Sequence, residues 1–202
     1  MNYNMKKIGI VGNIGSGKSY ISKILRKNGK IVIDLDSVAK SFYHLENVRL
    51  EMIEIFGDDI YIFGELDNKK LAEIIFNDDE KLERVEKLLK SYILEELFDE
   101  FYYQEYHAKQ DVIFVESATM MKTGLYREFD EMIIVDAPYF LRKNHVVEER
   151  GITEEDFDKR NKIQMKLCDI YYLLEKENIE YNIVDNNYTN DIMKEIDKFI
   201  RW

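Results

Sequence analysis

Short apolar runs alternate with amphipathic stretches along this chain. Five of these runs end at glycine or at an acidic residue and predict strands. They are 8–11, 31–33, 112–115, 132–135 and 181–184. Between the first two, Ile21, Ile24 and Leu25 recur at helical spacing before Gly29. This strand–helix–strand order predicts an α/β fold with a parallel sheet and with its site at the carboxyl ends of the strands.

Two helical segments interrupt this strand pattern. Residues 37–109 read as a helical insertion, broken at 56–59 and 63–67. Residues 139–166 predict a hairpin of helices, the second starting at Thr153 with Asp156 three positions later. Ile192, Ile196 and Ile200 predict a terminal amphipathic helix. We therefore expect one domain over 1–202, with its core in about 1–36, 110–138 and 180–202.

Composition narrows the classes of function. The net charge is −11, which disfavours a nucleic-acid or acidic-membrane surface. Cys168 is the only cysteine, which supports no intrachain disulfide and favours a reducing compartment. No apolar run approaches membrane-spanning length. We expect a soluble cytoplasmic protein that acts on a small molecule.

A glycine-rich loop follows the first strand. Gly12, Gly17, Lys18 and Ser19 fit the phosphate-binding pattern G-x-x-x-x-G-K-[ST], between a predicted strand and a predicted helix. Glycines let backbone N–H groups approach a polyphosphate, and the following helix directs its positive end at the same anion. In this pattern Lys18 reaches the β/γ-phosphates and the Ser19 hydroxyl ligates Mg²⁺.

Acidic residues follow two of the predicted strands. Asp34 and Asp36 come after the second strand, and Glu116 ends the third. Such carboxylates can face the phosphates or orient a metal or a water in phosphate-loop enzymes. A helix cap for either aspartate, or a structural role for Glu116, stays open.

Basic and aromatic side chains cluster in the two helical segments. Arg142, Arg150 and Arg160 surround the predicted hairpin, which could close as a lid over a transferring phosphate. Solvated helix charge is the alternative for each. Phe98, Phe101, Tyr102, Tyr103 and Tyr106 form a cluster that we predict to be helix core, with the wall of a substrate pocket as the alternative.

An ordered set of motifs resembles the dephospho-coenzyme A kinase family, within the nucleoside-monophosphate-kinase-like group. The motifs are the loop at 12–19, Ile33–Asp36 with Ala39, Gly64–Asp67 with Leu71 and Phe76, then Thr153, Arg160 and Gln164, and finally Ile183–Asn186. The resemblance implies a P-loop kinase fold of the α/β class, with a doubly wound parallel five-stranded sheet, a helical substrate-binding insertion and a mobile lid. It also implies transfer of the ATP γ-phosphoryl group to the ribose 3′-hydroxyl of dephospho-CoA.

The resemblance and the loop pattern together assign roles to residues. The residues expected to act in catalysis are Lys18, Asp36, Arg142 and Arg150. Those expected to hold ATP are Asn13, Ile14, Gly15, Ser16, Gly17, Lys18, Ser19, Tyr20, Arg160 and Asn186. Those expected at Mg²⁺ are Ser19, Asp34 and Glu116. Asp36 would orient or deprotonate the acceptor hydroxyl, and Asn186 would lie near the adenine.

Several positions depart from the family pattern. Lys90-Ser91 replaces His-Pro, the segment 116–121 differs after the third strand, and His145 and Glu149 stand where the lid carries arginine. These departures fall on the acceptor side and in the lid. A kinase of (deoxy)nucleoside monophosphates with the same fold, or a non-catalytic ATP-binding protein, therefore stays open as an alternative.

Overall fold

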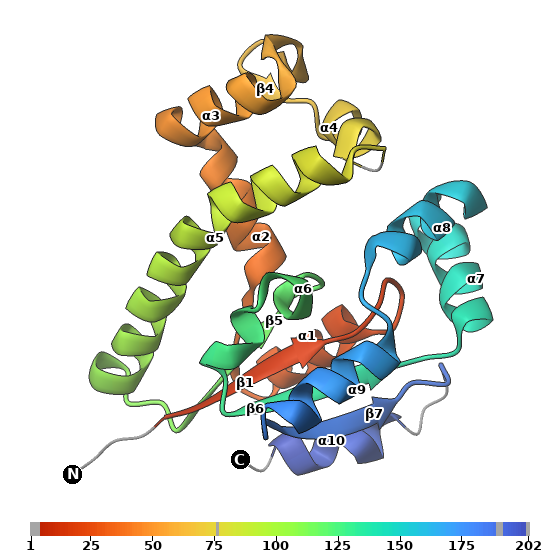
Figure 1. Ribbon diagram of the computed structural model, residues 1–202. Helices are drawn as coiled ribbons and strands as arrows, with labels where there is room; N and C mark the ends of the chain where they lie inside the picture. The colour runs from red at the N-terminus through yellow and green to blue at the C-terminus, as the bar shows by residue number, and fades with distance from the viewer. Residues whose placement is uncertain (1–4, 76, 189–191, 201–202) are drawn as a thin grey trace. The chain divides into compact units, whose positions relative to one another are not determined.

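A five-stranded parallel sheet forms the core of the protein (Figure 1). The computed structural model describes residues 5–75, 77–188 and 192–200. The strand order is β2-β5-β1-β6-β7, and every neighbouring pair is parallel, as the sequence predicts. The strands are β1 (Lys6–Val11), β2 (Ile31–Asp34), β5 (Val112–Glu116), β6 (Glu131–Asp136) and β7 (Glu180–Asp185).

The chain divides into two compact units. One comprises the residues up to Asp34 and from Glu100 onward, and the other comprises Leu35–Asp99. These boundaries differ from the expected ones near 37 and 109. Phe101 explains the second difference, because it is buried and its ring meets Phe129 edge-on at 5.9 Å, within the sheet unit.

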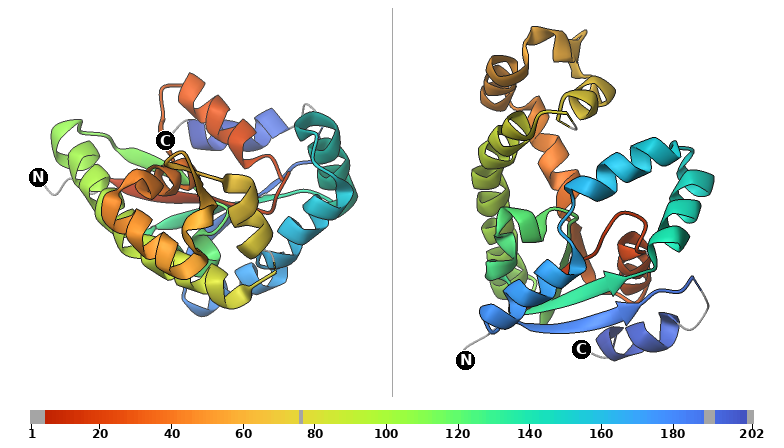
Figure 2. Two further views of the ribbon diagram at one scale, coloured as in Figure 1. Left: turned by 90° about the horizontal axis from the view of Figure 1, so that it is seen from above. Right: turned by 45° about the vertical axis from the view of Figure 1, so that its right-hand side comes forward.

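The first unit also contains helices. They are α1 (Lys18–Lys27), α6 (Met120–Thr123), α7 (Tyr139–Arg150), α8 (Glu154–Ile163), α9 (Leu167–Lys176) and α10 (Ile192–Ile200), with the 3-10 helix η4 (Leu125–Glu128) and the π-helical turn η3 (Tyr103–His107). Figure 2 (left) shows α1 and α10 on one side of the sheet and α9 on the other. The sheet is therefore covered on both faces, which explains its nearly continuous apolar strands.

One face of the sheet packs on α1 and α10. Alternate strand residues point to this face, as the two-residue period of a strand requires. They are Ile8, Ile10, Val112, Phe114, Ile133, Val135 and Val184, and they meet Ile21, Ile24, Leu25, Ile192, Ile196 and Phe199 from the helices. The predicted apolar stripe of the terminal helix is confirmed at Ile192 and Ile196, whereas the side chain of Ile200 lies outside the described residues.

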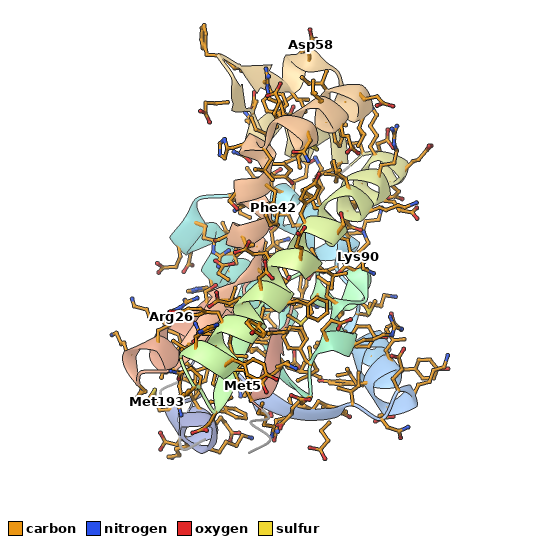
Figure 3. The ribbon with its side chains drawn as sticks, turned by 90° about the vertical axis from the view of Figure 1, so that its left-hand side faces the viewer. Met5, Arg26, Phe42, Asp58, Lys90 and Met193 are labelled. Carbon is orange, nitrogen blue, oxygen red and sulfur yellow. The ribbon has the colours of Figure 1, made fainter. Side chains whose placement is uncertain are left out.

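Arg26 joins α1 to the edge strand β2. Its side chain, labelled in Figure 3, donates from Nε and Nη2 to the Val32 carbonyl oxygen at 3.2 and 2.9 Å. The helix then ends at Asn28, and Gly29 adopts a φ of 77°, which confirms Gly29 as the predicted stop.

Methionines fill the opposite face beside the central strand. Gly9 lies on β1, and a Cβ atom there would sit 2.6 Å from the Met132 sulfur and 2.8 Å from the Met120 sulfur. Both methionines are fully buried. The absence of a side chain at Gly9 thus makes room for two long flexible ones.

The second unit is mainly helical. It contains α2 (Leu35–Ser41), η1 (Phe42–His44), α3 (Glu46–Phe56), η2 (Asp58–Ile60), β3 (Tyr61–Ile62), β4 (Glu65–Leu66), α4 (Asn68–Ile75) and most of α5 (Asp79–Tyr102). Asp67 caps α4, because its Oδ1 accepts hydrogen bonds from the backbone N–H groups of Lys69 and Lys70 at 3.0 and 3.1 Å. Phe76, which the family pattern includes, lies outside the described residues.

Two details of these segments differ from the sequence-based expectation. The predicted break at 63–67 is a small antiparallel hairpin of β3 and β4, whose turn residues Phe63 and Gly64 both have positive φ. Within the aromatic cluster Phe101 is buried as predicted, whereas Phe98, Tyr102, Tyr103 and Tyr106 are exposed and are not helix core. Within the described ranges, no helix has the length and apolar character needed to cross a bilayer.

The contact between Gly9 and Met132 predicts energetic coupling. Gly9→Ala would overpack this face and lower the free energy of unfolding by about 1–3 kcal/mol. Met132→Val would also destabilise, because it leaves a void. In the double variant the new methyl group enters that void, so we expect a combined loss below the sum of the two single losses. Urea unfolding of the four proteins measures this difference, and strictly additive losses would contradict the proposed packing.

Candidate active site

The loop between β1 and α1 is shaped by close backbone approaches. A Cβ atom at Gly12 would lie 2.4 Å from the Val135 carbonyl oxygen on β6. Gly17 has a φ of 104°, and a Cβ atom there would lie 2.3 Å from Asn186 Nδ2. Only glycine fits at either position without moving its neighbours. The two glycines of the motif are therefore required by the packing of this loop against the ends of β6 and β7.

Every carbonyl group of the loop accepts a hydrogen bond from the protein. Three donors lie within or next to the loop: Lys18 Nζ donates to Gly12 O at 2.7 Å, Ser16 N to Asn13 O at 3.0 Å and Tyr20 N to Gly17 O at 3.0 Å. Three come from distant side chains: Arg142 Nη1 donates to Ile14 O at 2.9 Å, the Tyr188 hydroxyl to Gly15 O, and Asn186 Nδ2 to Ser16 O at 2.8 Å. In a planar trans peptide the N–H points opposite to the C=O. The peptides that follow Ile14 and Ser16 therefore direct the N–H groups of Gly15 and Gly17 away from these partners, and backbone N–H groups left in this way suit an anion.

Two acidic side chains stand at the carboxyl ends of neighbouring strands. Asp34 on β2 and Glu116 on β5 are register partners. Burial raises the pKa of the Glu116 carboxyl, and the charge of Asp34 raises it further, whereas the nearby Ser22 hydroxyl and the Lys18 ammonium lower it. Glu116 is 5% exposed. The structure thus brings Asp34, Glu116 and Lys18 into one electrostatic neighbourhood.

The oxygens at these strand ends suit a hard cation. Glu116 Oε2 is buried and has no hydrogen-bond partner among the described residues. No group of three or more histidine, cysteine, aspartate or glutamate side chains gathers for a metal in the described ranges. Mg²⁺ needs no such cage, because it usually takes one or two carboxylates together with waters and substrate phosphates. Asp34 and Glu116 therefore supply oxygen atoms of the kind that Mg²⁺ takes, and the part of Ser19 in such a site stays a prediction.

The helices α7 and α8 form the predicted hairpin. Thr153 Oγ1 accepts a hydrogen bond from Asp156 N at 3.1 Å, which confirms the predicted cap of α8. Lys143 on α7 bonds Glu154 and Asp158 at 2.9 and 3.0 Å and so ties the two helices together. Phe157 is fully buried against the Tyr139 ring, at a centroid distance of 5.6 Å.

The three arginines of this segment occupy different environments. Arg150 and Arg160 are exposed, as groups that meet a ligand from solvent would be. Arg142 is 6% exposed and donates to Ala137 O, Ile14 O and Asn161 Oδ1 at 2.9 to 3.0 Å. The Nε and Nη1 atoms of Arg142 are thus bound to protein oxygens, and its expected role at the transferring phosphate stays a prediction.

Asn186 and Tyr188 carry the loop contacts from β7. The Asn186 backbone N–H donates to Asp136 O at 2.7 Å, and its side chain donates to Ser16 O and accepts from Tyr188 N at 2.9 Å. The Tyr188 ring lies 4.8 Å from the His145 ring. Tyr188 was not singled out from the sequence, because one tyrosine beyond a strand end carries no motif.

Asp36, the expected proton acceptor, lies in the second unit, in the first turn of α2.

The buried Glu116 carboxyl predicts a pH-dependent stability. Its pKa is raised in the folded state, so above pH 4.5 the folded protein binds more protons than the unfolded chain and loses stability as pH rises. Glu116→Gln removes this ionisation. We expect its melting temperature to exceed that of the wild type at pH 8, and the difference to shrink as pH falls. The exposed Glu83→Gln is the control for thermal unfolding, and a gain that grows toward acid pH would contradict the assignment.

Comparisons with known proteins agree with this geometry. The family model for dephospho-CoA kinase matches residues 6–190. The dephospho-CoA kinase of Aquifex aeolicus is 35% identical over 188 residues, which is 91% of this chain and 89% of that protein. The dephospho-CoA kinase of Fusobacterium nucleatum is 30% identical over 195 residues, which is 95% of each chain.

Solved structures share the fold. A protein from Thermus thermophilus superposes with a TM-score of 0.80 at 26% identity, over 98% of this chain and 97% of that chain. A dephospho-CoA kinase from Campylobacter jejuni gives a TM-score of 0.66 at 22% identity, over 96% and 95%. A shikimate kinase from Acinetobacter baumannii gives 0.52 at 15% identity, over 98% and 93%, a likeness of fold alone. With the match over residues 6–190, these findings identify the chain as a member of the dephospho-CoA kinase family.

Proposed function

We propose that this protein transfers the γ-phosphoryl group of ATP to the ribose 3′-hydroxyl of dephospho-CoA, the last step of coenzyme A biosynthesis. Membership of the dephospho-CoA kinase family over nearly the whole chain is the observation that carries this conclusion. The loop supports it independently, because the carbonyls of Ile14 and Ser16 are bound by protein donors and the N–H groups of the next residues face away from those donors, as a polyphosphate site requires. The products are ADP and coenzyme A.

Charge stabilisation is the main task of the loop in this reaction. The N–H groups of Gly15 and Gly17 and the Lys18 ammonium would hold the β- and γ-phosphates as negative charge shifts toward the leaving oxygen. Lys18 Nζ donates to Gly12 O at 2.7 Å, which holds the ammonium against the backbone of the loop. Ser19, with Asp34 and Glu116 through water, would hold Mg²⁺, which neutralises phosphate charge when bound.

Asp36 is our candidate for the group that receives the acceptor proton. The 3′-oxygen forms a bond to the γ-phosphorus, the bond from that phosphorus to the β-bridging oxygen breaks, and the hydroxyl proton passes to the Asp36 carboxylate. Its place in the Ile33–Asp36 motif supports this role, as does its position two residues after Asp34.

Lid and base-binding roles complete the proposal. Arg150 and Arg160, both exposed, would meet ATP phosphates as the α7–α8 hairpin closes. Asn186 would border the adenine, beside the loop that its side chain holds at Ser16.

An acceptor panel with γ-labelled ATP tests the reaction itself. We expect label on dephospho-CoA and none on dAMP, dGMP or dTMP. Lys18→Met should lower turnover by at least about 100-fold, because it removes the cation that opposes the transferring charge. Label on a nucleoside monophosphate alone would select the alternative kinase, and ATP binding without any labelled acceptor would select a non-catalytic binding protein.

A second test concerns the proton acceptor. Asp36→Asn removes the base and keeps the shape, so we expect kcat to fall by about 100-fold or more while the Kd for ATP changes little. Asp58→Asn, at an exposed position of the same unit, is the matched control and should retain full turnover. Normal turnover by the Asp36 variant would remove Asp36 from the mechanism.

A further inference from the structure

Arg142 is a buried cation that has no part in the reaction steps described above. Its Nε donates to Ala137 O at 3.0 Å, and its Nη1 donates to Ile14 O and to Asn161 Oδ1 at 2.9 Å each. Burial lowers the pKa of this guanidinium, so its position costs free energy. A group held at such a cost by three acceptors from separate segments organises those segments.

Both the carbonyl group and the N–H group of Ile14 form hydrogen bonds with side chains of the hairpin segment. Its carbonyl oxygen accepts from Arg142 on α7, and its N–H donates to Gln164 Oε1 at 2.7 Å, where Gln164 caps the end of α8. Asn161, the third acceptor of Arg142, also lies on α8. The tip of the phosphate loop is thus fastened to both helices of the hairpin.

We infer that Arg142 is a positioning residue that fixes the Ile14–Gly15 peptide and thereby sets the phosphate-binding conformation of the loop. The hydrogen bond from the guanidinium fixes the direction of the Ile14 carbonyl, and planarity then fixes the direction of the Gly15 N–H. Without the arginine this peptide is free to rotate about its flanking φ and ψ angles, and Gly15, at a φ of 77°, opposes that rotation little. The inference rests on the proposed ATP-binding function of the loop.

The affinities for ADP and ATP distinguish this positioning role from a direct contact between Arg142 and a phosphate group. Calorimetric titration of Arg142→Met with ADP and with ATP should show both affinities weakened by about tenfold, because both ligands need the loop donors. Dephospho-CoA affinity should stay unchanged, and the KM for ATP should rise more than kcat falls. Arg142→Lys should recover part of the ADP affinity, since a lysine can reach one of the carbonyl oxygens.

Lys143→Met provides the matched control. Lys143 is the neighbouring cation on α7, and its acceptors Glu154 and Asp158 belong to the hairpin rather than to the loop. We expect this variant to bind ADP as the wild type does. Equal losses in the Lys143 and Arg142 variants would mean that hairpin stability alone matters, and would overturn the inference.

Two other outcomes would also overturn it. Unaltered ADP affinity in Arg142→Met would show that the loop keeps its shape without the arginine. A loss confined to ATP, or to kcat, would indicate that Arg142 contacts the γ-phosphate directly. Should Arg142→Met fail to fold, Asn161→Ala keeps the arginine and removes one acceptor, and its ADP affinity should fall about two- to threefold rather than stay the same.

Nucleotide binding by the wild-type protein distinguishes a failure of this inference from a failure of the proposed function. Wild-type protein that binds neither ADP nor ATP would overturn both. Wild-type binding together with an unaffected Arg142 variant would overturn the inference alone.

Discussion

A loop that offers N–H groups to an anion must place its carbonyl groups elsewhere. An unpaired carbonyl shielded from water costs about as much as a lost hydrogen bond, and one turned inward would repel phosphate. This chain meets the requirement with a separate donor for each carbonyl from Gly12 to Gly17. Half of the donors are side chains from distant parts of the sequence, so the loop conformation depends on the whole sheet unit.

The strand order is what brings those donors to the loop. Because β1 lies beside β6, the β6–α7 junction passes the loop and places Arg142 against it. Because β7 follows β6, Asn186 and Tyr188 emerge beside Ser16 and Gly15. On the other side, β5 carries Glu116 next to Asp34 on β2. A parallel sheet gathers all of these groups on one side, because the carboxyl ends of all its strands lie there.

The sequence predicts much of this structure from local signals. Apolar runs mark all five strands, and Thr153 marks the start of α8, because burial and capping leave patterns within a few residues. The place of Arg142, the role of Tyr188 and the exposure of Tyr102 and Tyr106 were not predictable. Each depends on which distant segment lies nearby, and neither helical spacing nor residue type records that information. The roles proposed for Asp36, Arg150 and Arg160 rest on motif likeness and remain predictions.

The sequence separation of the paired strands bears on how the chain is made. Lys6 on β1 is the register partner of Val112, and Ile8 is the partner of Glu131, so the central strand finds its neighbours only after the whole second unit has been synthesised. On the ribosome β1 therefore emerges long before it can pair. Until then its apolar residues lack the partners that bury them in the folded protein, and the slow closure of such a long loop is expected to limit the rate of folding.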